Sequence, residues 1–170
     1  MQEIVTALNE RKIPYMLSGS LAMSAYTIPR MTRDIDIVID LDVNDIETFL
    51  QIFSPNFYFH RPGIEEEIRR RGMFNVIDHR SGYKIDFVVK KNTPYRKVEF
   101  ERKRQAVIFG FETWLVSAED LILSKLIWIQ ELQSEKQIED IKNLFENSTL
   151  DLSYIKRWIK ELNLETFNLI

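Results

Sequence analysis

The 170-residue sequence contains no cysteine, only two histidines, and five residues each of glycine and proline. The absence of cysteine excludes disulfide bonds and thiolate metal sites, and it suits a reducing compartment. His60 and His79 have no second histidine at ligand spacing, so neither is expected to bind a metal or to act in catalysis. The sparse glycine and proline form no linker, and no internal repeat is found.

Long hydrophobic runs are also missing. The longest apolar stretch, residues 121–129, is interrupted by Lys125 and is far shorter than a bilayer span. The N-terminus has an acid at Glu3 within an amphipathic pattern, which is not the pattern of a signal peptide. We therefore expect a soluble, cytoplasmic protein without a membrane partner.

The overall composition is typical of one globular domain, with 45% apolar and 29% charged residues. A net charge of -3 argues against wholesale coating of nucleic acid. One segment, residues 90–104, is strongly basic, with seven Lys or Arg against two Glu. We interpret it either as a solvated pair of strands or as the electrostatic footprint of an RNA or nucleotide acceptor.

Hydrophobic periodicity changes along the chain. Up to residue 116, helical patterns alternate with short strand patterns, and beyond that point the patterns are helical only. The expected strands are 15–17, 33–40 and 83–89, and the expected late helices are 117–133, 136–146 and 151–161. We therefore predict an α/β (α+β) fold, a mixed sheet with flanking helices, with a core over 1–116 and a helical cap over 117–170 packed as one compact unit.

Two aspartates interrupt the apolar strand pattern at residues 33–40. Asp34 and Asp36 are two residues apart, so on a strand they point to the same face with Cα atoms about 7 Å apart. Mg²⁺ is commonly bound by such carboxylates. If residues 83–89 lie beside this strand, Asp86 adds a third carboxylate, and a triad of this kind holds two metal ions about 3.5 to 4 Å apart. The alternative is a surface pair or a turn cap, which is how we interpret Asp40 and Asp42.

Upstream of the aspartates, Gly19 and Ser20 form a turn that leads into a helical pattern. Such a turn exposes backbone N–H groups and a hydroxyl, which suit the phosphates of a nucleotide. The alternative is an ordinary helix cap. A phosphate turn followed by a carboxylate pair indicates nucleotide chemistry more strongly than either feature does alone.

Gly19-Ser20, thirteen residues, and then Asp34-Ile35-Asp36-Ile37 resemble the signature of the DNA polymerase β-like nucleotidyltransferase superfamily, and Asp86 matches its third carboxylate. More narrowly, residues 18–39, 117–126 and 134–144 resemble the AbiEii-type nucleotidyltransferases of bacterial toxin–antitoxin systems. The gap before Asp34 and the late segment depart from the usual pattern. In that segment Asp140 matches the late aspartate, whereas Lys136 only loosely replaces a basic residue.

The resemblance implies a role for each matching residue. Gly19 and Ser20 would hold the triphosphate of an NTP such as ATP. Asp34, Asp36 and Asp86 would bind Mg²⁺ or Mn²⁺, and Asp86 would also favour deprotonation of the acceptor hydroxyl.

The resemblance extends to three more positions. Arg30 and Thr32 match the residues before the aspartates, and Arg30 either contacts phosphate or is a solvated loop arginine. Lys125 shares a helical face with Leu121, Trp128, Ile129 and Leu132, where an unpaired ammonium would be costly. By resemblance Lys125 reaches the nucleotide phosphates, and the alternative is a lysine that extends to the solvent at the rim.

The sequence thus predicts a metal-dependent nucleotidyltransferase that transfers NMP from an NTP to a hydroxyl of an RNA, such as tRNA, or of a partner protein. The alternative is a catalytically silent, antitoxin-like binding protein on the same fold. A phosphohydrolase fits less well because metal-binding histidines are lacking. The preferred base and the oligomeric state stay open.

Overall fold

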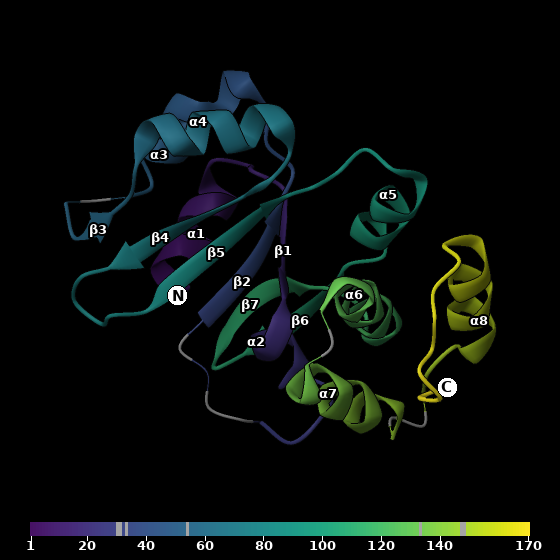
Figure 1. The fold of residues 1–170 in the computed structure, drawn as a ribbon. Coiled ribbons are helices and arrows are strands. Elements are labelled where there is room, and N and C mark those ends of the chain that lie inside the picture. The colour runs from purple at the N-terminus through teal and green to yellow at the C-terminus, as the bar shows by residue number, and fades with distance from the viewer. Residues whose placement is uncertain (30–31, 33, 54, 133, 147–148) are drawn as a thin grey trace.

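A computed structural model describes residues 1–29, 32, 34–53, 55–132, 134–146 and 149–170. Its centre is a seven-stranded mixed sheet in the order β3-β4-β5-β2-β1-β7-β6 (Figure 1). The strands are β1 (Tyr15–Ser18), β2 (Asp34–Ile39), β3 (Phe57–Tyr58), β4 (Met73–Asp78), β5 (Lys84–Val89), β6 (Arg104–Ile108) and β7 (Phe111–Leu115). The helices are α1 (Gln2–Glu10), α2 (Gly19–Met23), α3 (Ile46–Leu50), α4 (Arg61–Arg70), α5 (Pro94–Glu101), α6 (Ala118–Glu131), α7 (Glu135–Phe145) and α8 (Leu152–Glu161), with a 3-10 turn η1 (Val43–Asp45) before α3. The predicted mixed α/β fold is confirmed.

The strand pairings place the predicted site at the centre of the sheet. β2 runs parallel to β5, and β1 lies antiparallel to β2 on its other side. β1 also pairs in parallel with β7, through Leu17 and Leu115, and the β6–β7 hairpin completes that edge. The neighbouring position of β2 and β5 is the arrangement on which the predicted carboxylate triad depends.

The two faces of the central strands differ because side chains alternate along a strand. Ile35 and Ile37 of β2 and Phe87 of β5 are buried on one face, which α1 and α3 cover. Phe49 of α3 packs edge-on against Phe87, with 5.2 Å between the ring centroids. The opposite face of the same strands carries the charged side chains, and Asp34 is exposed there.

The local signals in the sequence explain where the helices start. Ser117 caps α6 by accepting a hydrogen bond from the N–H of Asp120 (3.1 Å), and Asp42 caps η1 in the same way. His60 accepts a bond from the N–H of Gly63 and so caps α4. The interpretation of residues 90–104 as a pair of strands is wrong. Pro94 starts α5 within this segment, and only Arg104, the last residue of the segment, begins a strand.

The helices after residue 116 pack around α6. Its side chains Leu121, Ile122 and Leu126 are almost fully buried, and both α7 and α8 contact it. In Figure 1 these three helices lie together beside the β1–β7–β6 end of the sheet. The division into a core over 1–116 and a cap over 117–170 stays a prediction.

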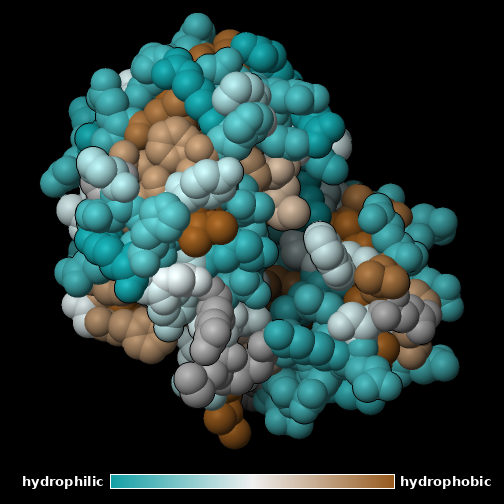
Figure 2. Space-filling view, turned by 60° about the vertical axis from the view of Figure 1, so that its left-hand side comes forward, coloured by the Kyte–Doolittle hydropathy of each residue, from teal (hydrophilic) through white to brown (hydrophobic). Residues whose placement is uncertain are grey.

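Seen from the β3–β4 side, the molecular surface is mostly hydrophilic and is broken by separate apolar patches (Figure 2). Among the helices that the described residues form, none is both long enough and apolar enough to span a bilayer.

Candidate active site

Four charged side chains form a two-by-two arrangement on the charged face of β2 and β5. The register pairs Asp34 with Lys84 and Asp36 with Asp86. Asp34 is exposed, Asp36 is half-buried, and Asp86 is buried with 8% of its surface exposed. The three aspartates that the sequence predicted to converge therefore lie on adjacent positions of adjacent strands.

Lys84 completes this arrangement, and sequence reasoning had given it no role. Its Nζ lies 2.7 Å from Oδ2 of Asp86 and 3.8 Å from Oδ1 of Asp34. The pairing with Asp86 raises the pKa of Lys84. The signal was present in the sequence, because Lys84 precedes Asp86 by two residues and so must share its face.

Asp36 has no such ion pair with any described residue. Burial raises the pKa of Asp36, and the neighbouring carboxylates of Asp86 and Asp34 raise it as well, whereas the ammonium of Lys125 lowers it. A half-buried carboxylate between two others is a position that a cation would stabilise.

The turn before α2 approaches Asp36 closely. Gly19 has a φ of +58°, and a Cβ atom at this position would lie 1.9 Å from Oδ2 of Asp36. Only glycine fits here, because both the backbone conformation and the adjacent carboxylate exclude a side chain. Gly19 therefore lies against the carboxylate of Asp36, at the start of α2, which is only five residues long. The phosphate-binding role of Gly19 and Ser20 stays a prediction.

The segment before β2 is described only in part. The hydroxyl of Thr32 donates to the carbonyl of Asp34 and accepts from its N–H, both at 3.2 Å, so Thr32 shapes the start of β2. Arg30, to which the sequence gave a phosphate contact, lies outside the described residues.

Lys125 is buried in α6, with 6% of its surface exposed. Its Nζ donates to Oδ2 of Asp140 and to Oε1 of Gln137, both on α7 and both at 2.7 Å. Lys125 is thus buried with a partner, as expected from the high cost of an unpaired buried ammonium, and it does not extend to the solvent at the rim. The expected apolar stripe around it is only partly right, because Trp128 and Leu132 are exposed.

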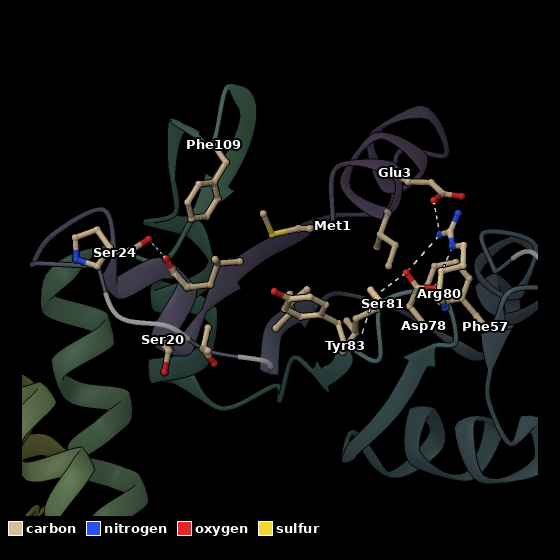
Figure 3. Close-up of a pocket in the computed structure, with 16 residues that line it drawn as sticks. Met1, Glu3, Ser20, Ser24, Phe57, Asp78, Arg80, Ser81, Tyr83 and Phe109 are labelled. Atoms are coloured by element: carbon tan, nitrogen blue, oxygen red, sulfur yellow. Dashed lines mark hydrogen bonds and ion pairs between the residues drawn. The ribbon is translucent and has the colours of Figure 1, made fainter.

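A cavity of about 610 Å³ lies on the other face of the sheet (Figure 3). Ile35 and Ile85 line it, so the strands separate it from the carboxylates that point the opposite way. Glu3, Arg80 and Asp78 close one end through ion pairs, with Arg80 Nη2 2.8 Å from Glu3 and Nε 3.1 Å from Asp78. Ser20 belongs to both regions, because it lines the cavity and follows Gly19 directly.

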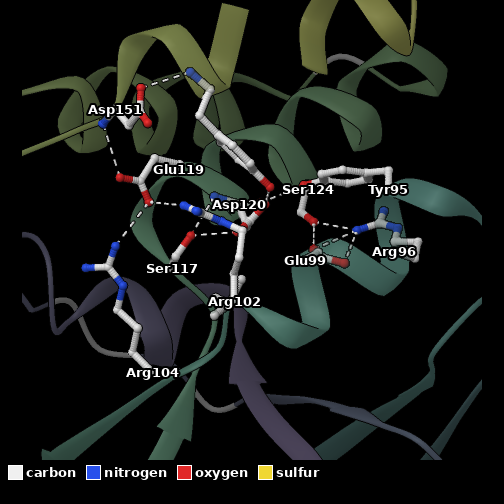
Figure 4. Close-up of polar contacts among 12 residues, drawn as sticks. Tyr95, Arg96, Glu99, Arg102, Arg104, Ser117, Glu119, Asp120, Ser124 and Asp151 are labelled. Carbon is white, nitrogen blue, oxygen red and sulfur yellow. Dashed lines mark hydrogen bonds and ion pairs between the residues drawn. The ribbon is translucent and has the colours of Figure 1, made fainter. Parts of the chain in front are cut away.

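Part of the basic segment, residues 90–104, is neutralised by carboxylates of this chain, and Figure 4 shows the pairs of its arginines. Arg102 pairs with the fully buried Asp120 at 3.0 Å, and Arg96 pairs with Glu99 at 2.8 Å. Lys90 pairs with Asp40, Arg104 pairs with Glu119, and Lys103 lies over the ring of Phe100. The contacts of Arg102 and Arg104 connect this segment to the start of α6. Four of its seven cations form ion pairs, whereas Lys91 and Lys97 are exposed.

The carboxylates have the chemistry of a divalent metal site but not its finished geometry. Oxygen ligands suit Mg²⁺ and Mn²⁺, and within the described part of the chain Asp36 makes no competing ion pair. Among the residues that the structure describes, however, no three Asp, Glu, His or Cys side chains are arranged to hold a metal ion. Lys84 instead neutralises Asp86.

The sequence matches, over residues 1–168, the family described as nucleotidyltransferase of unknown function (DUF6036). No curated protein matches it. Solved structures share the fold. ANT(2″)-Ia in complex with adenylyl-2″-tobramycin has a TM-score of 0.60 at 15% identity, and the alignment covers 95% of each chain.

Two further structures are similar. The lincosamide antibiotic adenylyltransferase LnuA, bound to lincomycin, has a TM-score of 0.56 at 16% identity, with 86% of this chain and 97% of that chain covered. An antigenic nucleotidyltransferase-like protein from Paracoccidioides brasiliensis has a TM-score of 0.53 at 18% identity, with 94% and 86% covered. At such identities the likeness shows the fold alone.

Proposed function

Because the chain belongs to this family of nucleotidyltransferases, we propose that it transfers an NMP group from an NTP, such as ATP, to a hydroxyl, with Asp34, Asp36 and Asp86 at the reaction centre. The observation that carries the proposal is the register of β2 and β5, which sets Asp36 opposite Asp86 beside the Gly19 turn.

The three carboxylates would hold Mg²⁺ or Mn²⁺. When bound, such an ion neutralises phosphate charge and makes the acceptor hydroxyl more acidic. The half-buried carboxylate of Asp36, whose pKa is raised by burial and by Asp86, supports this assignment.

The other residues would bind and orient the nucleotide. The N–H groups of the Gly19 turn and the hydroxyl of Ser20 would hold the triphosphate, with Lys125 behind Asp36 as a further positive charge. The acceptor oxygen forms a bond to the α-phosphorus, the bond from that phosphorus to the bridging oxygen breaks, and pyrophosphate leaves. Asp86 takes the proton of the hydroxyl. We keep phosphate roles for Arg30 and Thr32 as predictions.

For the acceptor we propose a hydroxyl of a partner protein ahead of one on RNA or tRNA. The reason is that Arg96, Arg102 and Arg104 pair with carboxylates of this chain, which weakens the basic footprint that RNA would need. A small-molecule hydroxyl is a second candidate, favoured by the adenylyl-2″-tobramycin described with ANT(2″)-Ia.

Membership of a toxin–antitoxin system and the narrower AbiEii-type resemblance also stay proposals. A catalytically silent, antitoxin-like binding protein is the alternative. The complete set of aspartates and the glycine that accommodates Asp36 favour activity, because a silent domain has no need of three carboxylates that repel one another.

The first prediction concerns transfer itself. The protein is incubated with each α-labelled NTP and Mg²⁺, together with a protein fraction, an RNA fraction or a metabolite fraction of a cell lysate. We expect label in one fraction, and we expect Asp36→Asn to reduce it by at least about a hundredfold, as for other groups at a reaction centre.

Asp40→Asn is the matched control, because Asp40 follows the same strand but pairs with Lys90 at the far end. Transfer that persists in Asp36→Asn would contradict the proposed reaction centre. Absence of transfer to all three fractions, together with no NTP-dependent change in melting temperature, would favour the silent binding protein.

A further inference from the structure

Lys84 occupies an unusual position for a surface lysine. It stands in register with Asp34, one strand away, and two residues before Asp86 on its own strand. Its side chain is 43% exposed, yet its ammonium lies 2.7 Å from a carboxylate whose own side chain is only 12% exposed. The positive charge therefore sits on the solvent side of the carboxylate cluster.

The charges of the cluster explain why a cation lies there. Asp34, Asp36 and Asp86 are close enough to repel one another, and the ammonium of Lys84 reaches two of them. Among the described residues, Lys84 is the lysine or arginine that forms ion pairs with Asp34 and Asp86, and none pairs with Asp36. Because like charges on adjacent strand positions destabilise a sheet, this contact offsets a cost that the sheet would otherwise bear.

On the premise of the proposed function, we propose that Lys84 is a positioning residue of the carboxylate site, whose ammonium holds Asp86 and Asp34 in the metal-free protein and must be displaced when a divalent cation binds. A long, flexible lysine that is almost half exposed can swing into solvent without moving the backbone.

The displacement has a consequence for the order of binding. A cation that arrives alone must compete with an ammonium already in place, so its affinity is reduced. A cation that arrives on a triphosphate brings negative groups to which the released ammonium can turn. The arrangement therefore favours entry of the cation together with the nucleotide over entry of the cation alone.

The test measures Mn²⁺ binding to the full chain without nucleotide, by the loss of the electron paramagnetic resonance signal of free Mn²⁺. Lys84→Met removes the charge and keeps the length of the side chain. Lys84→Arg keeps the charge. Lys90→Met is the matched control, because Lys90 forms an ion pair between the same two strands at their other end, with Asp40. Asp36→Asn reports whether the ion binds at the carboxylates.

We expect Lys84→Met to bind Mn²⁺ about three- to tenfold more tightly than the unaltered protein, the effect of removing a competing ion pair. Lys84→Arg and Lys90→Met should bind as the unaltered protein does. In a second measurement, Mn²⁺ should raise the melting temperature of Lys84→Met by more than it raises that of the unaltered protein. The melting transition itself shows that the variant is folded.

The outcomes separate this inference from the proposed function. If Asp36→Asn abolishes Mn²⁺ binding but Lys84→Met binds Mn²⁺ no more tightly than the unaltered protein, the role of Lys84 is refuted and the metal site is retained. No Mn²⁺ binding by any of the proteins would overturn both. Tighter binding by Lys90→Met as well would also refute the inference, because it would make the effect one of overall charge.

Discussion

At the scale of single residues, Gly19 is the position where the fold and the site constrain each other most. Its φ of +58° alone disfavours any side chain, and the carboxylate of Asp36 occupies the space that a Cβ would need. Gly82 has a similar φ of +71° but nothing within 4 Å of its Cβ position. A comparison of the two glycines therefore separates the free-energy cost of the backbone conformation from the cost of the contact with Asp36.

The second prediction uses this pair. Gly82→Ala should reduce the free energy of unfolding by about 1 to 2 kcal/mol, the cost of a left-handed residue with a side chain. Gly19→Ala should cost about 3 kcal/mol or more, because the displaced Asp36 adds a steric term, and it should abolish transfer. Urea unfolding and the labelled-NTP assay measure the two effects. Equal costs at the two positions would show that Asp36 does not lie against the turn.

The positions of single side chains could be predicted where the sequence has a clear strand periodicity. Asp34, Asp36 and Asp86 were predictable because a period of two fixes the face of a strand residue. The same rule placed Lys84 on that face, but nothing in the sequence showed that its ammonium would turn toward the carboxylates. The exposure of Trp128 was not predictable either, because α6 has neighbours on several sides and a simple apolar stripe does not describe it.

At the scale of elements, α6 and α7 are joined by the buried pair of Lys125 and Asp140. The sequence required some partner for Lys125 but did not identify it, because the partner comes from the next helix and the crossing of two helices is decided by tertiary packing. The pair has two separable consequences, one for stability and one for the charge near Asp36.

The third prediction separates them. Lys125→Met and Asp140→Leu should each reduce the free energy of unfolding by about 3 kcal/mol, since each removes one half of a buried ion pair. The loss in the double variant should be smaller than the sum of the two single losses by at least about 1 kcal/mol. If Lys125 contacts phosphates, the double variant should regain stability but not transfer.

Arg157→Met and Glu161→Leu are the control pair, because this ion pair on α8 is more than half exposed. Arg157→Met also removes contacts with the rings of Tyr154 and Trp158, so the control is the coupling energy of the two changes, which should stay below about 0.5 kcal/mol. An additive result for Lys125 and Asp140 would show that their contact contributes nothing specific.

At the scale of the whole molecule, the predicted boundary at residue 116 separates a core from a helical cap, yet α6, the first helix of that cap, is deeply buried. Leu121, Ile122 and Leu126 are at most 1% exposed, and Asp120 accepts bonds from Arg102 and from Tyr154 of α8 (Figure 4). The change of pattern at residue 116 marks where strands stop, but sequence periodicity does not say whether two segments share a core. Shared burial favours one cooperative unit.

The fourth prediction follows from that shared core. The full chain should unfold in a single calorimetric transition with equal calorimetric and van't Hoff enthalpies. A chain ending at Val116 should lack a cooperative transition, whereas a chain that lacks only residues 163–170 should keep one because α6, α7 and α8 stay whole. A sharp transition in the shorter chain would establish residues 1–116 as an independent domain.

The position of β1 affects how the protein is made. Its Tyr15 bonds to Thr113 of β7, 98 residues later in the chain, at 3.2 Å. At about 5 to 20 residues per second, a ribosome takes roughly 5 to 20 s to synthesise that interval, during which one edge of β1 has no strand beside it. The nascent chain is therefore most exposed to misassembly with other chains before β7 emerges, and its yield depends on the speed of translation as well as on the stability of the finished fold.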